Sequence, residues 1–508
     1  MPNTPDAQAY EEMTRRFATI AHLNGAASLL DWDQMTKLPP GGREARGAQN
    51  AALEGVIHER LVDPALADAV ERVAATMDPD DEFTHDWVRQ AREDIRQATA
   101  VPAQLVEALA LTTSKANAAW VKAREASDFA SFAPVLAEVV ELNRERADAL
   151  GWTEHRYDAL HRIYEPGSST ERVRGLFARL QAVLPGLVQE AAEGDASRQD
   201  DVVERPIAAA VQERIVRDVT ARLGYDYDRG RLDETVHPFA QAIGVGDVRI
   251  TTRYAEDRWP TAFFGGVHEA GHAMYEQGIP AALYGTPLGR YASLAVHESQ
   301  SRLWENHVAR SQAFWEGYLP HFDAASGGTF AGVDAPQMAR AVNRVYPSLI
   351  RIEADQVTYP LHVILRFELE VQLIEGSLSV QDLPDAWNDG MQRLLGVTPP
   401  SDALGVLQDV HWSIGAIGYF PTYALGSMMA AQLWERMEHD LPDLEDAMRA
   451  GRFEPLLGWL QERVHALGRR KLPDDLMTAA TGRALDPEPY VRHLTHVAQG
   501  DLTRRLTS

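Results

Sequence analysis

The chain of 508 residues contains no cysteine. Disulfide bonds are therefore impossible, which excludes a secreted fold held together by a disulfide framework. Structural zinc sites built from thiolates are excluded for the same reason. Any zinc site in this protein has to use histidine and carboxylate ligands, the set that catalytic zinc centres use.

Long apolar runs and excess positive charge are also missing. No run of about 18 apolar residues occurs, so no membrane-spanning helix is expected. The first residues lack the basic and apolar regions of a signal peptide, which predicts a cytoplasmic protein. Lys and Arg number 49 against 74 Asp and Glu, and the net charge of −25 disfavours partners such as nucleic acid or anionic membranes.

Strand patterns are few, and amphipathic stretches with helical spacing dominate the chain. Helices are predicted at 10–30, 40–61, 64–77, 86–98, 102–126, 129–150 and 204–223, with later helices beginning near Pro336, Leu349, Val380, Pro421, Leu441 and Pro455. Length alone favours two to four domains of about 150 residues. No repeat, low-complexity segment or linker interrupts the motifs described below, so we expect one mainly α catalytic unit over residues 1–508.

One strand is predicted at Asp247–Tyr254, where β-branched residues alternate between two faces. It lies just before the His-rich helix described next. We interpret it as part of a small β-hairpin or sheet, with an edge strand that could hold an extended peptide by backbone hydrogen bonds. The alternative is a purely structural hairpin.

The most informative segment reads His268-Glu269-Ala270-Gly271-His272, the H-E-x-x-H pattern of zinc peptidases. Two imidazoles four residues apart share one face of a helix and can reach one ion. Glu269 is placed to contact a water molecule beside that ion, so the five residues indicate metal-assisted hydrolysis. Gly271 is unfavourable inside a helix by about 1 kcal/mol, which suggests that another segment approaches there closely.

A catalytic zinc needs a third protein ligand. A second amphipathic stretch begins at Val296-His297-Glu298 and continues to Trp315. A carboxylate near the start of a second helix that packs across the first would complete the site, so Glu298 is the predicted third ligand. His297 and His307 are the competing candidates.

Several segments together resemble the carboxypeptidase Taq-like metallocarboxypeptidases. Besides H-E-x-x-H, the matching blocks are Asp247–Thr251 (D-x-R-x-T), His297–Gln300 (H-E-S-Q), Ile350–Asp355 (I-R-x-x-A-D) and Gly405–Trp412 (G-x-x-Q-D-x-H-W), with His237–Phe239 and Trp32–Pro39 upstream. Leu38 stands where the family more often has Met. Order and spacing agree over almost the whole chain.

The resemblance implies a mainly helical, zincin-type (gluzincin-like) fold with a deep active-site cleft. It implies that a helical N-terminal part, about residues 1–230, covers the cleft, and that the metal and substrate site occupies about residues 231–430. It also implies a divalent metal, a homodimer, and release of C-terminal amino acids from peptides with a free C-terminus. Specificity is expected to be broad, with C-terminal proline disfavoured.

Roles follow for individual residues. His268, His272 and Glu298 would hold Zn²⁺, or Co²⁺ since N/O sites accept several divalent ions. Glu269 would act as general base and then as general acid.

A free C-terminal carboxylate suits an arginine fork. Arg351 is the first candidate and Arg249 the second. The alternative for Arg351 is an internal salt bridge with Glu353 or Asp355.

The oxyanion of the reaction intermediate needs hydrogen-bond donors. Tyr423 is the predicted donor, and His411 and Tyr419 are predicted substrate or oxyanion contacts, while Trp412 and Phe420 are expected in the core. Asp355 and Asp409 could orient the metal-binding imidazoles or act only locally. The competing functions are a zinc endo-oligopeptidase on a related scaffold and a non-catalytic peptide-binding protein.

Overall fold

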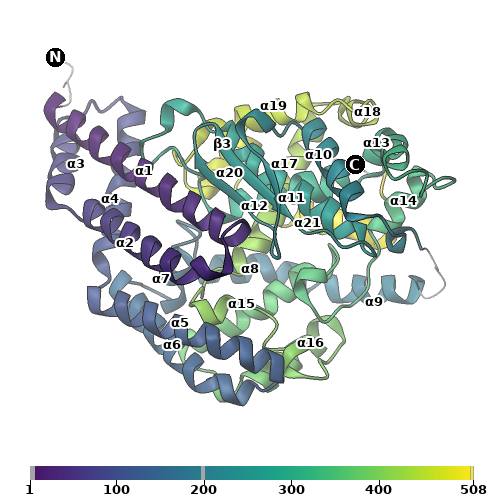
Figure 1. Ribbon diagram of the computed structural model, residues 1–508, viewed down its shortest axis with the longest axis horizontal. Helices are drawn as coiled ribbons and strands as arrows, with labels where there is room; N and C mark the ends of the chain where they lie inside the picture. Colours follow the sequence, from purple (N-terminus) through teal and green to yellow (C-terminus); the bar gives the residue numbers. More distant parts are fainter. Residues whose placement is uncertain (1–5, 196–200, 504, 507–508) are drawn as a thin grey trace.

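The computed structural model describes residues 6–195, 201–503 and 505–506, and this part of the chain is mainly helical (Figure 1). The N-terminal helices are α1 (Ala7–Thr36), α2 (Arg43–Leu61), α3 (Pro64–Thr76), α4 (Glu82–Ala100), α5 (Ala103–Ala126), α6 (Phe129–Leu150), α7 (Arg156–His161), α8 (Thr170–Gln181), α9 (Leu184–Asp195) and α10 (Ala209–Leu223). Among the described residues, no helix combines the length and apolar character needed to cross a membrane.

The second half carries α11 (Trp259–Gly278), α12 (Leu294–Arg302), the π-helix η5 (Leu303–Ala309), α13 (Gln312–Ala325), α14 (Ala335–Val342), α15 (Tyr359–Glu375), α16 (Leu383–Leu395), α17 (Pro421–Asp440), α18 (Leu444–Arg449), α19 (Glu454–Arg463), α20 (Pro473–Thr481) and α21 (Glu488–Gln499). The predicted mainly helical fold is confirmed. Aspartates cap several of the expected helices; Asp63, for example, accepts a hydrogen bond from Ala65 N before Pro64 opens α3.

The helix predicted to begin near Leu349 is wrong. This segment forms a short 3₁₀ turn, η6 (Arg351–Glu353), and α15 begins only at Tyr359. The carboxylate of Asp355 accepts hydrogen bonds from the backbone nitrogens of Val357 and Thr358. Such a local turn satisfies backbone donors without a helix, and the block that contains Arg351 therefore lies in irregular structure.

The small sheet contains β1 (Leu232–Glu234), β2 (Ala240–Gly244) and β3 (Asp247–Thr252) in the order β1-β3-β2. The strand predicted from the sequence is β3, and it is parallel to β1 and antiparallel to β2. The expectation that it is an edge strand is wrong, because both of its sides are paired. The hairpin alternative matches the β2–β3 pair.

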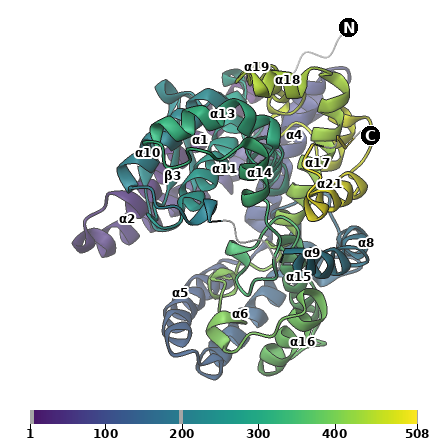
Figure 2. The same cartoon turned by 90° about the vertical axis from the view of Figure 1, so that its right-hand side faces the viewer.

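Two hydrophobic clusters fill the interior. The larger one runs from Ala116 through the metal-site helices to Leu506. The smaller one joins α1 to α4 and includes Leu283 and Leu288, which lie between α11 and α12. In Figure 2, α5, α6 and α16 lie on the lower side of the molecule, away from α11 and α13. Helices α1 to α4 thus have their own core and attach to the segment that joins α11 and α12.

Candidate metal centre

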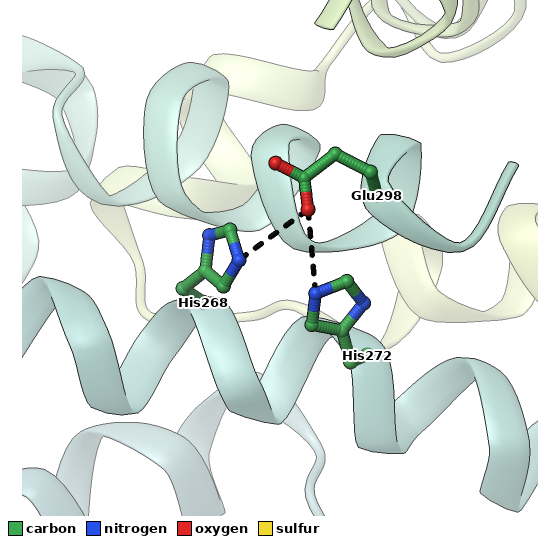
Figure 3. Close-up of side chains that lie close together, drawn as sticks. All are labelled: His268, His272 and Glu298. Carbon is green, nitrogen blue, oxygen red and sulfur yellow. Dashed lines mark ion pairs between the residues drawn. The ribbon is translucent and has the colours of Figure 1, made fainter. Parts of the chain in front are cut away.

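Three side chains from α11 and α12 converge. His268 and His272 stand one turn apart on α11, and Glu298 reaches them from α12 (Figure 3). The Oε2 atom of Glu298 lies 3.5 Å from His268 Nε2 and 3.4 Å from His272 Nε2. One ligand atom from each residue lies within 4.8 Å of the others. Two imidazole nitrogens and one carboxylate oxygen are a donor set that suits a divalent metal.

The two helices come into contact at Gly271. A Cβ atom at this position would lie 2.7 Å from Ser301 Cα and 2.8 Å from Gln300 O, both in the α12 backbone. The close approach expected from the sequence at Gly271 is therefore present, and it brings Glu298 within reach of the histidines.

The outer nitrogens of both histidines have partners of their own. His268 Nδ1 lies 2.9 Å from Glu305 Oε2, and His272 Nδ1 lies 3.0 Å from the carbonyl oxygen of His297. Each partner accepts a proton on Nδ1, which leaves Nε2 free to bind a metal. The ring orientations thus fit a metal held by Nε2 of both residues and Oε2 of Glu298.

Sequence reasoning missed Glu305. The sequence offers Asp355 and Asp409 as acceptors for the imidazoles, but Asp355 caps its own turn and Asp409 pairs with two arginines. Burial would raise the pKa of Glu305, but Arg302, His268 and Arg310 outweigh it and hold that pKa below its usual range. A carboxylate two turns beyond Glu298 on the same predicted helix was the available signal.

The competing third ligands have other contacts. The ring of His297 stacks on His272 with centroids 4.4 Å apart, and its Nε2 lies 3.2 Å from Glu276 Oε1. His307 faces another environment, against Trp434 and His493. Neither belongs to the cluster that could hold a metal within the described residues.

Glu269 lies between the two histidines on α11 and is only 7 % exposed. Burial raises its pKa to about 7 in the protein without metal, and charges on His268, Glu298 and Glu305 also act on it. Its carboxyl group is therefore within electrostatic range of the ligand cluster, as the position of a general base requires.

Arg302 adds a positive charge beside the ligands. Its Nε lies 2.7 Å from Glu298 Oε1 and its Nη1 lies 3.2 Å from Glu305 Oε2. The guanidinium also lies over the ring of Tyr359, 4.4 Å from the centroid. Sequence reasoning did not single out this residue, although it follows Glu298 at a spacing of four.

Arg351 is buried and paired internally, but not with Glu353 or Asp355. Its Nε and Nη2 lie 3.0 and 2.8 Å from Asp409 Oδ1, and its Nη1 donates to the hydroxyl of Tyr359 at 3.2 Å. Three of its five N–H donors are used in these bonds, so two are left for another acceptor.

The second arginine candidate, Arg249, pairs with Asp247 two residues earlier in β3, at 2.8 Å. Its guanidinium lies 4.3 Å from the centroid of the Trp32 ring. Two of the matching sequence blocks, Asp247–Thr251 and Trp32–Pro39, are therefore in contact in the folded protein.

The aromatic candidates form one group. His411 Nε2 lies 3.1 Å from the Tyr423 hydroxyl, and the Tyr419 and Tyr423 rings are 5.2 Å apart. Burial raises the pKa of both tyrosines, and the charge of Glu298 adds to the effect, so both hydroxyls stay protonated and lie within range of the metal ligands. Trp412 and Phe420 are buried in the core, as expected.

Comparisons with known proteins agree with this geometry. The family model of the carboxypeptidase Taq (M32) metallopeptidases matches residues 12–497. Thermostable carboxypeptidase 1 of Thermus thermophilus is 41% identical over 97% of this chain and 98% of its own, and carboxypeptidase 1 of Bacillus subtilis is 39% identical over 94% and 95%.

Solved structures show the same fold. The M32 carboxypeptidase from Deinococcus radiodurans R1 superimposes with a TM-score of 0.94 at 39% identity, over 97% of this chain and 99% of that one. A carboxypeptidase from Pyrococcus furiosus gives a TM-score of 0.94 at 34% identity, over 97% and 99%. The chain is accordingly a peptidase with a site for a divalent metal. It belongs to the carboxypeptidase Taq (M32) family of metallopeptidases.

Proposed function

We propose that this protein uses Zn²⁺, or Co²⁺ in its place, to release single amino acids from the C-termini of peptides. The observation that carries the proposal is the convergence of His268, His272 and Glu298 with Glu269 beside them. Broad specificity, with C-terminal proline disfavoured, is proposed from the family resemblance.

The ligand residues and Glu269 have separate tasks in this mechanism. When bound by the two histidines and Glu298, a divalent cation supplies Lewis-acid chemistry that polarises the scissile carbonyl and acidifies water. Glu269 takes a proton from the attacking water and later delivers it to the leaving amine. Glu305 and the carbonyl of His297 keep the imidazoles in the tautomer that binding requires.

Arg351 is our candidate for the terminal carboxylate, with Arg249 second. Two N–H groups of Arg351 remain after its bonds to Asp409 and Tyr359, and its buried guanidinium contacts the Tyr423 ring, 5.0 Å from the centroid. This contact links Arg351 to the residue proposed as the oxyanion donor. A fixed fork beside that donor would select a peptide whose last residue carries a free carboxylate.

Tyr423 is the proposed donor to the oxyanion, and His411 and Tyr419 are proposed to contact the substrate. Burial and the charge of Arg351 lower the pKa of His411 to about 3, so its imidazole is neutral and can share a proton with Tyr423. A phenol held in place before the reaction stabilises developing negative charge without reorganisation.

The dependence on a free C-terminus tests the proposal. One peptide and its C-terminal amide are incubated with the metal-loaded protein, and products are followed by mass spectrometry. We expect single amino acids to leave the free peptide in order, and the amide to resist. Internal cleavage of both would indicate the endo-oligopeptidase, and binding without cleavage would indicate a peptide-binding protein.

A homodimer in the cytoplasm, with peptides as its partners, is proposed from the resemblance and the sequence. The net charge of −25 supports the expectation that nucleic acid and anionic membranes are not partners. Light scattering after size exclusion tests the homodimer directly: a mass near 56.3 kDa would contradict it.

A further inference from the structure

The two oxygens of Glu298 lie in different surroundings. Oε2 faces the two imidazoles at 3.5 and 3.4 Å and accepts a hydrogen bond from Ser301 Oγ at 3.1 Å. Oε1 instead accepts a hydrogen bond from Arg302 Nε at 2.7 Å. A carboxylate can bind a metal through one oxygen or two, and here a cation already engages one of them.

Arg302 cannot easily swing away from that position. Its Nη1 donates to Glu305 Oε2 at 3.2 Å, and its guanidinium lies over the Tyr359 ring at 4.4 Å. The hydroxyl of Tyr359 in turn accepts a hydrogen bond from Arg351. The side chain of Arg302 is only 16% exposed, so water competes weakly for these contacts.

We propose that Arg302 is a positioning residue that holds Oε1 of Glu298, so that this carboxylate binds the divalent metal through Oε2 alone. The inference rests on the metal site of the proposed function. It adds that the protein limits its own ligands to two nitrogens and one oxygen. One position of a four-coordinate metal then stays open for water and substrate.

The choice of arginine follows from its planar fork. One guanidinium binds Glu298 and Glu305 with different nitrogens while its flat face rests on an aromatic ring, which a lysine ammonium cannot do. Without Arg302, two buried carboxylates would stand beside each other without this shared counter-charge. Glu298 would then be free to turn both oxygens toward a cation.

Visible spectroscopy of the Co²⁺-loaded protein tests the proposal without measuring activity. Metal is removed by chelation and one equivalent of Co²⁺ is added, because four-coordinate Co²⁺ absorbs more strongly than five-coordinate Co²⁺. We expect the intense spectrum of four-coordinate Co²⁺ in the wild type. In Arg302→Met we expect the bands to weaken by about twofold or more as coordination increases. Arg302→Lys should recover part of the intensity, since an ammonium can still bind Oε1.

Arg310→Met is the matched control. Arg310 also pairs with Glu305, at 3.0 Å, but its other contacts in the described chain are the Val342 carbonyl and the Phe264 ring rather than Glu298, so this variant should keep the wild-type spectrum. If Arg302→Met does not fold, the double variant Arg302→Met/Glu305→Gln removes one charge of each sign, and the same weakening is expected.

Three outcomes would overturn the inference: a wild-type spectrum in Arg302→Met or in the folded double variant, the same loss in Arg310→Met, or a weak spectrum in the wild type itself. Failure of the wild type to bind Co²⁺ would instead refute the metal site of the proposed function.

Discussion

Two glycines set how closely neighbouring helices approach Glu298, the candidate third ligand, and the helix that carries it. Gly271 lets α11 touch the backbone of α12, and Gly426 lets α17 pack against Glu298. A Cβ atom at residue 426 would lie 2.6 Å from the Cβ of Glu298, closer than real Cβ atoms come. The position of Glu298 therefore depends on two residues that have no chemistry of their own.

Gly426→Ala should weaken metal binding and destabilise the protein. Replacing a helical glycine normally stabilises by up to about 1 kcal/mol. Here the clash with Glu298 costs about 1–3 kcal/mol, which exceeds that gain, so the free energy of unfolding should fall. Metal affinity by calorimetry and unfolding by denaturant measure both effects. Gly458→Ala in α19, where a Cβ meets nothing within 4 Å, is the control and should be neutral or stabilising. A stabilising Gly426→Ala variant with unchanged metal affinity would contradict this account of the site.

Arg351→Lys should reduce recognition of a free C-terminus. The substitution keeps the charge beside Asp409, whereas a neutral side chain would leave this buried carboxylate with Arg366 as its remaining arginine partner. We expect KM for a free peptide to rise about tenfold, with a smaller change in kcat, because a bidentate contact is lost. In binding assays the preference for a free peptide over its amide should shrink. If the preference for the free peptide over its amide does not change, Arg249 becomes the candidate that binds the terminal carboxylate.

The three candidate ligand residues could be singled out from the sequence, whereas several of their partners could not. H-E-x-x-H and Glu298 follow from local spacing and from the need for a third ligand. The bonds of Arg351 to Asp409 and of His268 to Glu305 join residues 58 and 37 positions apart. Such pairs depend on how helices pack, and spacing along one chain does not encode that.

At the scale of elements, periodicity found most helices but not their irregular ends. The sequence predicts one amphipathic helix from Val296 to Trp315, yet residues Leu303–Ala309 form a π-helix in which every residue is buried. A π segment shifts the helical register, so a period of 3.6 residues describes only the part of this stretch outside Leu303–Ala309. Glu305 lies in this segment, seven residues after Glu298, and that spacing alone does not distinguish it from other acidic residues.

The role of β3 shows a similar limit. Alternation of residues predicted the strand correctly, but the order β1-β3-β2 is a tertiary property. Because β3 is paired on both sides, it cannot take up a peptide as an added strand. The strand does lie next to α11, as its position in the sequence suggested, because Thr252 at the end of β3 donates a hydrogen bond to Ala262 O in α11.

A buried acid that contacts the start of α12, Glu165, should make stability depend on pH. Glu165 Oε2 accepts a hydrogen bond from Ala295 N, and burial raises the pKa of Glu165 from 4.5 to about 8. Between pH 4.5 and about 8, Glu165 is deprotonated in the unfolded chain but still protonated in the folded protein. The contribution of Glu165 to stability therefore falls as pH rises through this window, and levels off above it.

Glu165→Gln cannot ionise, so it should gain stability relative to the wild type as pH rises from about 5 to about 8. Unfolding by denaturant at several pH values gives the difference in unfolding free energy, in which other groups cancel. A difference that is constant with pH would show that Glu165 is ionised in the folded protein.

At the scale of the molecule, metal binding should stabilise one core more than the other. All three candidate ligands lie on helices of the larger hydrophobic cluster, while α1 to α4 share the smaller one. A ligand that binds only the folded state adds about 4 kcal/mol at a thousandfold excess over its Kd. Calorimetry with metal and with chelator should show a large upward shift in Tm for the main transition with metal. An unchanged Tm would contradict a metal site in the folded core.

We propose that a metal held by His268, His272 and Glu298 would work together with Glu269 to release C-terminal amino acids. The most direct test is a time course of amino-acid release from one free peptide, with metal removed by chelator and then restored. In the wild type we predict that release stops and returns with Zn²⁺ or Co²⁺. In Glu269→Gln we predict the same metal content but release slower by about 10²–10⁴-fold. Release that continues without metal, or near-wild-type release by metal-loaded Glu269→Gln, would contradict the account.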